Sequence, residues 1–187
     1  VTTPVALVTG GSRGIGAAIA EVLTDANWQV LAPTRSELDL SDSGSIDEFL
    51  VDSPKVFGLV LNAGINEPAE IAYIDDATWQ RTLDINTASA FRLVRALAPQ
   101  MAETGGGRIV AVSSAYAARA RMGRAAYGAS KAALEALVRS TAVEFASSGV
   151  LANAIAPGFV DTELTRVNND ASAISALLER VPVGRLA

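Results

Sequence analysis

The sequence contains no cysteine and no histidine among its 187 residues. Without cysteine, disulfides and thiolate metal sites are excluded. Without histidine, Ser-His-Asp catalysis and histidine-based zinc sites are excluded as well. We therefore expect no metal site, and any proton transfer must use tyrosine, lysine, a carboxyl group or a hydroxyl group.

Excess positive charge and long apolar runs are also missing. The formal net charge is −5, which argues against nucleic acid as a partner because phosphate binding requires a basic face. No apolar run approaches the roughly 18 residues that a membrane span needs, and no signal peptide is recognisable. We expect a cytoplasmic protein that does not enter a membrane.

Apolar strand-like runs alternate with helical patterns along the whole chain. The runs are continuously apolar, which is typical of a parallel sheet covered by helices on both faces. The pattern predicts one doubly wound α/β domain over residues 1–187. The expected strands are 5–10, 29–33, 37–41, 55–64, 105–114 and 150–158, and the expected helices are 11–28, 43–52, 75–103, 124–149 and 162–180.

Glycines and small polar residues gather where these strands end. They occur at 10–16, 62–64, 113–114 and 157–158. In a doubly wound sheet the ligand crevice lies outside the carboxyl ends of the strands. We therefore expect these segments to meet at one binding site.

The segment TGGSRGIG follows the first strand and begins the first helix. Glycines there allow a tight turn close to a pyrophosphate, and the helix start offers free N–H groups. The spacing of Gly10, Gly14 and Gly16 is G-x-x-x-G-x-G and differs from the usual G-x-G-x-x-G. An ordinary structural turn is the alternative.

Two arginines favour NADP(H) over NAD(H), although NAD(H) stays possible. The second strand ends without the acid that usually bonds the ribose of NAD, and Arg35 stands there instead. Arg13 lies inside the glycine loop. Two guanidinium groups suit a 2′-phosphate. The alternative is that both are solvated surface charges.

Lysine is rare in this chain, which contains 13 arginines but only Lys55 and Lys131. Tyr127 lies four residues before Lys131, so the two are neighbours on a helix face. An ammonium group close to a phenol favours the phenolate and lowers its pKa. The pair is thus a candidate proton-transfer site, although a chance pair at this spacing is common.

Five motifs in order make the chain resemble the short-chain dehydrogenase/reductase family, and most closely its 3-oxoacyl-acyl carrier protein reductase type. They are TGGSRGIG, LNAG (61–64), DIN (84–86), VSS ahead of YGASK, and APGFVDT (156–162). The resemblance implies a Rossmann-like fold and an NADPH-dependent oxidoreductase. Its substrate would be a 3-oxoacyl thioester or a similar small carbonyl, reduced to a secondary alcohol or formed in the reverse reaction.

The resemblance also implies the roles of individual residues. Tyr127 would be the general acid/base, Lys131 would lower its pKa and bind the nicotinamide ribose, Ser114 (rather than Ser113) would hold the substrate oxygen, and Asn86 would anchor a proton relay. The implied cofactor-binding residues are Gly10, Ser12, Arg13, Gly14, Ile15, Gly16, Arg35, Asp39, Leu40, Asn62, Ala63, Gly64, Tyr127, Lys131, Pro157, Gly158 and Thr162.

The chain departs from the family pattern in two places. Only two residues separate VLAPTR from LDLSD, so the helix that family members have after the second strand is expected to be missing or reduced to a turn. The chain stops at VPVGRLA, so the final strand of the family fold is expected to be missing and the fifth strand to be an open edge.

Partners and alternative functions follow from the same resemblance. The family implies a homotetramer or homodimer, with an acyl carrier protein as one carrier of the substrate. Arg119, Arg121 and Arg124 suggest an anionic substrate or carrier, unless they form a solvated or subunit-contact loop. Alternatives are an NAD-dependent alcohol or sugar dehydrogenase, a nucleotide-sugar epimerase or dehydratase, and a non-catalytic dinucleotide-binding regulator.

Overall fold

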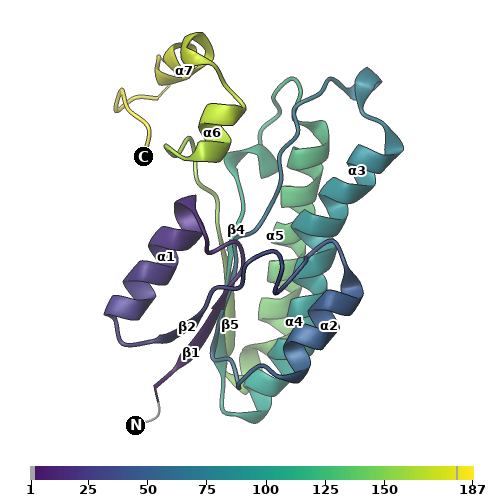
Figure 1. Cartoon of the computed structure of the whole chain (residues 1–187), viewed down its shortest axis with the longest axis vertical. Coiled ribbons are helices and arrows are strands. Elements are labelled where there is room, and N and C mark those ends of the chain that lie inside the picture. The colour runs from purple at the N-terminus through teal and green to yellow at the C-terminus, as the bar shows by residue number, and fades with distance from the viewer. Residues whose placement is uncertain (1–2, 180) are drawn as a thin grey trace.

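The computed structural model of the chain describes residues 3–179 and 181–187. Five parallel strands form one sheet in the order β2-β1-β3-β4-β5 (Figure 1). The strands are β1 (Val5–Val8), β2 (Gln29–Leu31), β3 (Gly58–Leu61), β4 (Gly107–Val112) and β5 (Val150–Ile155). The predicted doubly wound α/β fold is therefore confirmed.

The strands at the centre of the sheet are apolar because helices cover them on both faces. All four residues of β3 are buried, and Leu7 of β1 pairs in register with Leu31 on one side and Leu59 on the other. The strand order reverses at β1, which has β2 on one side and β3 on the other. A ligand crevice is expected where the order reverses, outside the carboxyl ends of β1 and β3.

Helix α1 (Gly14–Asp25) lies on one face of the sheet, and α2 (Ser43–Val51), α4 (Ser89–Glu103) and α5 (Ala125–Phe145) lie on the other (Figure 1). Helix α4 repeats apolar residues every three or four positions, and this stripe is buried against the sheet and its neighbours. Burial of each large apolar side chain contributes about 1.5–3 kcal/mol to the free energy of folding. The main core is thus on the α4 and α5 side.

The third strand predicted at 37–41 is wrong, because this segment forms turns. The Leu38 backbone N–H donates to the Thr34 carbonyl at 3.0 Å, and the Asp39 carboxylate accepts from the Ser41 N–H and hydroxyl at 2.9 and 2.6 Å. Leu38 is buried in the core, and Leu40 packs against it. These local bonds satisfy the backbone, so β2 remains an edge of the sheet. As expected, the chain between β2 and α2 is a turn with no helix.

The helix predicted over 75–103 is present but has a change of winding within it. Helix α3 (Asp76–Leu83) passes into a π-helical segment, Asp84–Ala88, before α4 begins. Such π segments are rare and often occur at functional sites. This one carries Asn86, the residue that the resemblance implies for a proton relay.

Two predicted helices near the carboxyl end differ in their extent. The helix at 124–149 continues from α5 through a short 3-10 turn to Gly149, whose φ of 78° matches the predicted terminating glycine. The helix at 162–180 is divided into α6 (Glu163–Val167) and α7 (Ala171–Leu178), because Asp170 caps a new helix by accepting from the Ala173 N–H at 2.7 Å. Residue 180 lies outside the described residues.

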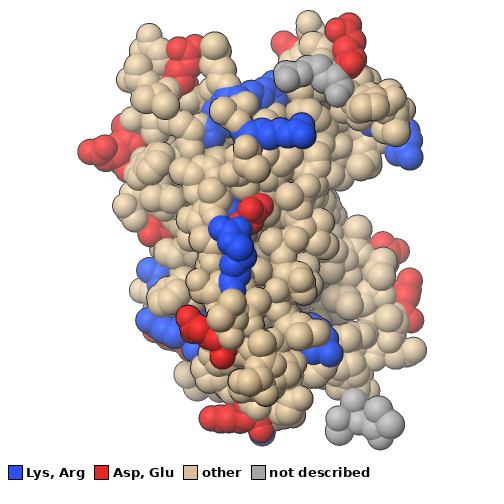
Figure 2. All heavy atoms as spheres, turned by 180° about the vertical axis from the view of Figure 1, so that it is seen from behind, with Lys and Arg blue, Asp and Glu red and all other residues tan. Residues whose placement is uncertain are grey.

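Basic and acidic side chains are mixed over the face that Figure 2 shows. Among the side chains described there, none gather into the broad basic surface that a nucleic-acid backbone requires. Within residues 3–179 and 181–187, no helix combines the length and the apolar character needed to cross a bilayer.

Candidate active site

A cavity of about 410 Å³ opens at the carboxyl ends of the strands, beside the point where their order reverses. Its walls come from the loops after all five strands and from the start of α5. It is lined by these predicted site residues: Gly10, Ser12, Arg13, Gly14, Ile15, Arg35, Asp39, Leu40, Asn62, Ala63, Gly64, Ser114, Tyr127, Lys131, Pro157, Gly158 and Thr162. Segments that lie far apart in the sequence thus meet at one site, as their positions at the ends of the strands predicted.

The glycine loop forms one end of this cavity. Gly10 and Gly14 have φ values of 63° and 55°, which side chains disfavour. A Cβ on Gly16 would lie 2.2 Å from the Gly10 carbonyl oxygen, so only glycine allows α1 to approach the loop. The N-cap residue Arg13 makes no side-chain capping bond, which leaves N–H groups at the helix start available. This end of the cavity fits a pyrophosphate.

Thr9 and Asn62 fasten the glycine loop to the segment after β3. The Asn62 amide donates to the carbonyls of Thr9 and Gly10 at 3.0 and 3.1 Å. The buried Thr9 hydroxyl donates to the Val60 carbonyl at 3.2 Å and accepts from the backbone N–H groups of Asn62 and Ala63 at 3.0 and 3.1 Å. Sequence reasoning missed Thr9. Its signal was a hydroxyl residue directly after an apolar strand.

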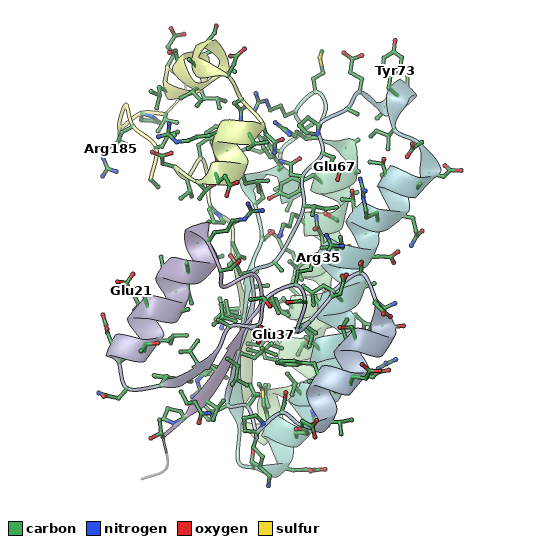
Figure 3. The ribbon with its side chains drawn as sticks, viewed as in Figure 1. Glu21, Arg35, Glu37, Glu67, Tyr73 and Arg185 are labelled. Carbon is green, nitrogen blue, oxygen red and sulfur yellow. The ribbon has the colours of Figure 1, made fainter. Side chains whose placement is uncertain are left out.

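Both arginines expected to favour a 2′-phosphate line the cavity, and both have carboxylate partners. Arg35, labelled on the loop after β2 in Figure 3, contacts Asp39 at 3.3 Å. The Ser41 hydroxyl and N–H, more than Arg35, hold the pKa of Asp39 below its usual value. Arg13 pairs with Glu163 of α6 at 2.6 Å. Sequence reasoning also missed Glu163.

Lys131 carries its amine in a buried position. The side chain is 3% exposed, and its Nζ donates to the Val112 carbonyl at 2.7 Å. Burial lowers the pKa of Lys131 to about 8, because desolvation disfavours the ammonium form. The Nζ lies 5.8 Å from the centre of the Tyr127 ring.

The expectation that Lys131 lowers the pKa of Tyr127 stays a prediction, because the shift of this pKa in the structure comes from burial and from Ser114, Arg124 and Tyr116. Burial raises the pKa of Tyr127, and this effect exceeds the lowering by the hydrogen bond with Ser114 and by the charge of Arg124. The Lys131 amine is directed at the Val112 carbonyl, and burial is the largest cause of the raised Tyr127 pKa. The phenol therefore stays protonated at neutral pH.

The two neighbouring serines after β4 have different surroundings. The Ser113 hydroxyl donates to the Glu135 carboxylate at 2.7 Å and is thereby engaged with α5. The Ser114 hydroxyl accepts from the Tyr116 N–H at 3.2 Å and lies close enough to Tyr127 to lower the pKa of its phenol. Ser114 is therefore the serine that stands beside the phenol.

Asn86 and Gly16 are the predicted site residues that do not line the cavity. Asn86 is 1% exposed, and its amide bonds both backbone groups of Ile65, accepting at 2.8 Å and donating at 2.9 Å. It also donates to the Ser130 hydroxyl at 2.9 Å. A Cβ on Gly64 would lie 3.1 Å from the Asn86 Oδ1 and 3.4 Å from the Lys131 Nζ. Asn86 thus supports the cavity wall from behind.

Comparison with known proteins places this geometry in a family. Residues 37–173 match the family model described as short chain dehydrogenase. The 3-oxoacyl-[acyl-carrier-protein] reductase FabG of Salmonella typhimurium is 35% identical, over 97% of this chain and 83% of that protein. The acetoacetyl-CoA reductase of Rhizobium meliloti is 34% identical, over 97% of this chain and 84% of that protein.

A solved structure is similar over the whole chain. It is a gluconate 5-dehydrogenase from Burkholderia cenocepacia J2315, in complex with NADP and tartrate. The TM-score is 0.92 and the sequences are 29% identical, with 100% of this chain and 84% of that chain covered.

Proposed function

Because the chain belongs to the short-chain dehydrogenase family, we propose that it is an NADPH-dependent oxidoreductase that interconverts a ketone and a secondary alcohol. The observation that carries this proposal is the meeting of Ser114, Tyr127 and Lys131 at one end of a cavity whose other end is a glycine loop at a helix start. A dinucleotide fits between the two ends, since backbone groups and small residues line the loop end.

The chain's own residues would provide proton transfer and positioning. In the reductive direction the Tyr127 phenol, which holds its proton at neutral pH, donates that proton to the carbonyl oxygen. The Ser114 hydroxyl holds the same oxygen. When bound, the cofactor supplies the hydride. Lys131 stabilises the phenolate that remains, because it is mostly protonated below its pKa of about 8.

The cofactor would be held by the residues that surround the cavity. The glycine loop and the start of α1 would hold the pyrophosphate. Arg13 and Arg35 would contact the 2′-phosphate, and Asp39 and Leu40 the adenine end. Thr162, with Pro157 and Gly158, would position the nicotinamide. The NADP named for the Burkholderia cenocepacia enzyme supports this preference.

The relatives leave two substrate classes for this proposal. The reductases from Salmonella typhimurium and Rhizobium meliloti support a 3-oxoacyl thioester, carried on acyl carrier protein or coenzyme A. The gluconate 5-dehydrogenase supports a sugar acid oxidised at a secondary alcohol. Both reactions use the same proton path through Tyr127. A homotetramer or homodimer remains our expectation for the assembly.

A panel of ketones and secondary alcohols, with NADPH and NADH in parallel, tests the proposal. We expect turnover, with kcat/KM about tenfold or more higher for NADPH, because a 2′-phosphate adds charge-assisted hydrogen bonds. Tight NADPH binding without any turnover would instead favour a non-catalytic dinucleotide-binding regulator. Preference for NADH would contradict the role of the two arginines.

Substitution of the phenol tests the mechanism. Tyr127→Phe should lower kcat by about 100- to 10,000-fold, the usual loss of a general acid, while the Kd for NADPH in a fluorescence titration stays within about threefold. Tyr73→Phe is the control, because Tyr73 is 79% exposed and points away from the cavity (Figure 3). Full activity of Tyr127→Phe would disprove the mechanism.

A further inference from the structure

The segment between β4 and α5 contains Arg119, Arg121 and Arg124. These three arginines differ in how deeply they are buried. Arg119 is exposed and Arg121 is half-buried. Arg124 is buried, with 7% of its surface exposed, directly before the first residue of α5. Fully buried arginines are uncommon unless a counter-charge accompanies them. The surroundings of Arg124 are therefore informative.

The described part of the chain provides no counter-charge for Arg124. Its Nη1 donates to the Asn66 side-chain oxygen at 3.0 Å, which is its one side-chain hydrogen bond among the described residues. The ion pairs found within residues 3–179 and 181–187 all involve other arginines. A guanidinium has five N–H donors. Most of those on Arg124 are thus available to a ligand.

A second positive charge lies close to Arg124 and is likewise bound by neutral groups. Arg121 donates to the Tyr116 hydroxyl at 2.9 Å and to the Asn169 side-chain oxygen at 3.5 Å. Burial, and then the charge of Arg121, lowers the pKa of Arg124. A buried charge whose neighbours are neutral or of like sign costs free energy. An anion from outside the chain would offset that cost.

Arg124 lies close enough to Tyr127 of the proposed site for its charge to act on the phenol, and it lines the neighbouring hollow beside the active-site cavity. It precedes Tyr127 by three residues, and its charge lowers the pKa of that phenol. Its partner Asn66 directly follows Ile65, which lines the active-site cavity. The Asn66 carbonyl also accepts from the Asn168 amide at 3.0 Å, which holds this corner under the segment between α6 and α7.

We propose that Arg124 binds a carboxylate of the substrate, so that this oxidoreductase acts on a small oxo acid and the corresponding hydroxy acid in preference to a neutral ketone. The proposal rests on the proposed function and selects between its substrate classes. A guanidinium binds a carboxylate through two parallel hydrogen bonds. Because Arg124 is buried, the carboxylate has to belong to a small molecule, since acidic groups on the surface of a carrier protein cannot reach it.

Matched acids and esters test the proposal. The probes are 3-oxobutanoate and 4-oxopentanoate, each beside its methyl ester, with NADPH as the reductant. For the wild type we expect kcat/KM to be about 10- to 150-fold higher for the better acid than for its ester, the range that a hydrogen-bonded charge supplies. Arg124→Gln should remove this preference, which is a ratio of two kcat/KM values and is therefore independent of any effect of the lost charge that is common to the acid and the ester.

Two further variants define the role of the charge. Arg124→Lys should keep part of the preference, because it retains a charge without the paired geometry. Arg119→Gln, which removes an exposed arginine of the same segment, should behave as the wild type. If Arg124→Gln keeps the full preference for the acid, the proposal is wrong while the oxidoreductase function stands. If the wild type reduces no ketone, the proposed function itself fails.

A measurement on the wild type alone covers the case in which Arg124→Gln does not fold. Succinate should inhibit reduction of the methyl ester competitively, because its carboxylate would occupy the place beside Arg124. A second hollow of about 570 Å³, lined by Arg119, Arg121, Arg124 and the outer side of α5, offers anions another position. Non-competitive inhibition would place the anion in that hollow and overturn the proposal, as would the absence of inhibition.

Discussion

At the residue scale, the buried position of Lys131 makes its charged form unfavourable in free energy. An ammonium group has lost most of its water there and has one carbonyl in its place, that of Val112. The fold therefore holds a charge in a setting that favours the neutral amine. An arginine could not respond in this way, since its guanidinium remains protonated in proteins. A position that needs both charge and a pKa close to neutral is thus suited to lysine.

The burial of Lys131 predicts a pH dependence of stability. The pKa is about 8 in the folded chain and 10.5 ordinarily. Between these values the unfolded chain keeps the proton that the folded chain releases, so stability rises with pH through this window and the penalty is complete below it. Relative to Lys131→Met, the wild type should gain roughly 3 kcal/mol in its free energy of unfolding between about pH 7 and pH 10.5.

Urea unfolding of both proteins across this range measures the difference. Lys55→Met serves as the control, because Lys55 is exposed and its substitution should give no pH-dependent difference. A difference that is flat, or that falls as pH rises, would contradict the lowered pKa.

At the element scale, the loop before α1 depends on an approach that only glycine permits. The first turn of α1 lies against the loop so closely that a Cβ on Gly16 would be 2.4 Å from the Asn62 amide nitrogen. That amide in turn fixes the loop through the carbonyls of Thr9 and Gly10. The helix start, the loop and the end of β3 thus form one unit, and this unit shapes the cofactor end of the cavity.

Gly16→Ala should disturb this unit. We expect a loss of about 1–3 kcal/mol in the free energy of unfolding, the usual cost of overpacking, and a weaker Kd for NADPH. Chemical unfolding and a fluorescence titration measure the two effects. Gly44→Ala in α2 is the matched control, because its Cβ would meet only the Asp42 carboxylate, at 3.3 Å. Equal effects of both substitutions would show that the close approach is unimportant.

At the scale of the whole molecule, the Arg13–Glu163 pair joins segments from opposite ends of the chain. The glycine loop follows the first strand, whereas α6 follows the last. The two side chains are 70% and 60% exposed, so the pair contributes at most about 1 kcal/mol. It nevertheless occupies the guanidinium that the proposed 2′-phosphate needs. NADPH and Glu163 should therefore compete for Arg13.

Glu163→Gln tests this competition. We expect the Kd for NADPH to fall a few-fold, because Arg13 is released, and the Kd for NADH to stay unchanged. Arg13→Gln should raise the Kd for NADPH about tenfold without affecting NADH. Titration of both cofactors measures this, with Glu21→Gln on the outer side of α1 as the control (Figure 3). Equal effects on the two cofactors would contradict a role for Arg13 at the 2′-phosphate.

Particular residues show which features of the structure could be predicted from the sequence. Strand ends are visible in sequence because a buried parallel strand is continuously apolar and stops at glycine or a polar residue, so the meeting of Gly10, Asn62, Ser114 and Pro157 was predictable. The turns at 37–41 were not predictable, because the short apolar pattern of this segment fits a strand equally well. Thr9 was missed, since its role depends on partners more than 50 residues away.

The sequence by itself determined the fold class, the family and the set of residues at the strand ends, because periodicity, glycine spacing and motif order are local properties of the chain. Only the tertiary structure decided the electrostatics of the site. Burial raises the pKa of Tyr127 and lowers that of Lys131. It also leaves Arg124 without a counter-charge among the described residues. Desolvation and the choice of partner depend on what surrounds a side chain in space, and the sequence does not display those surroundings.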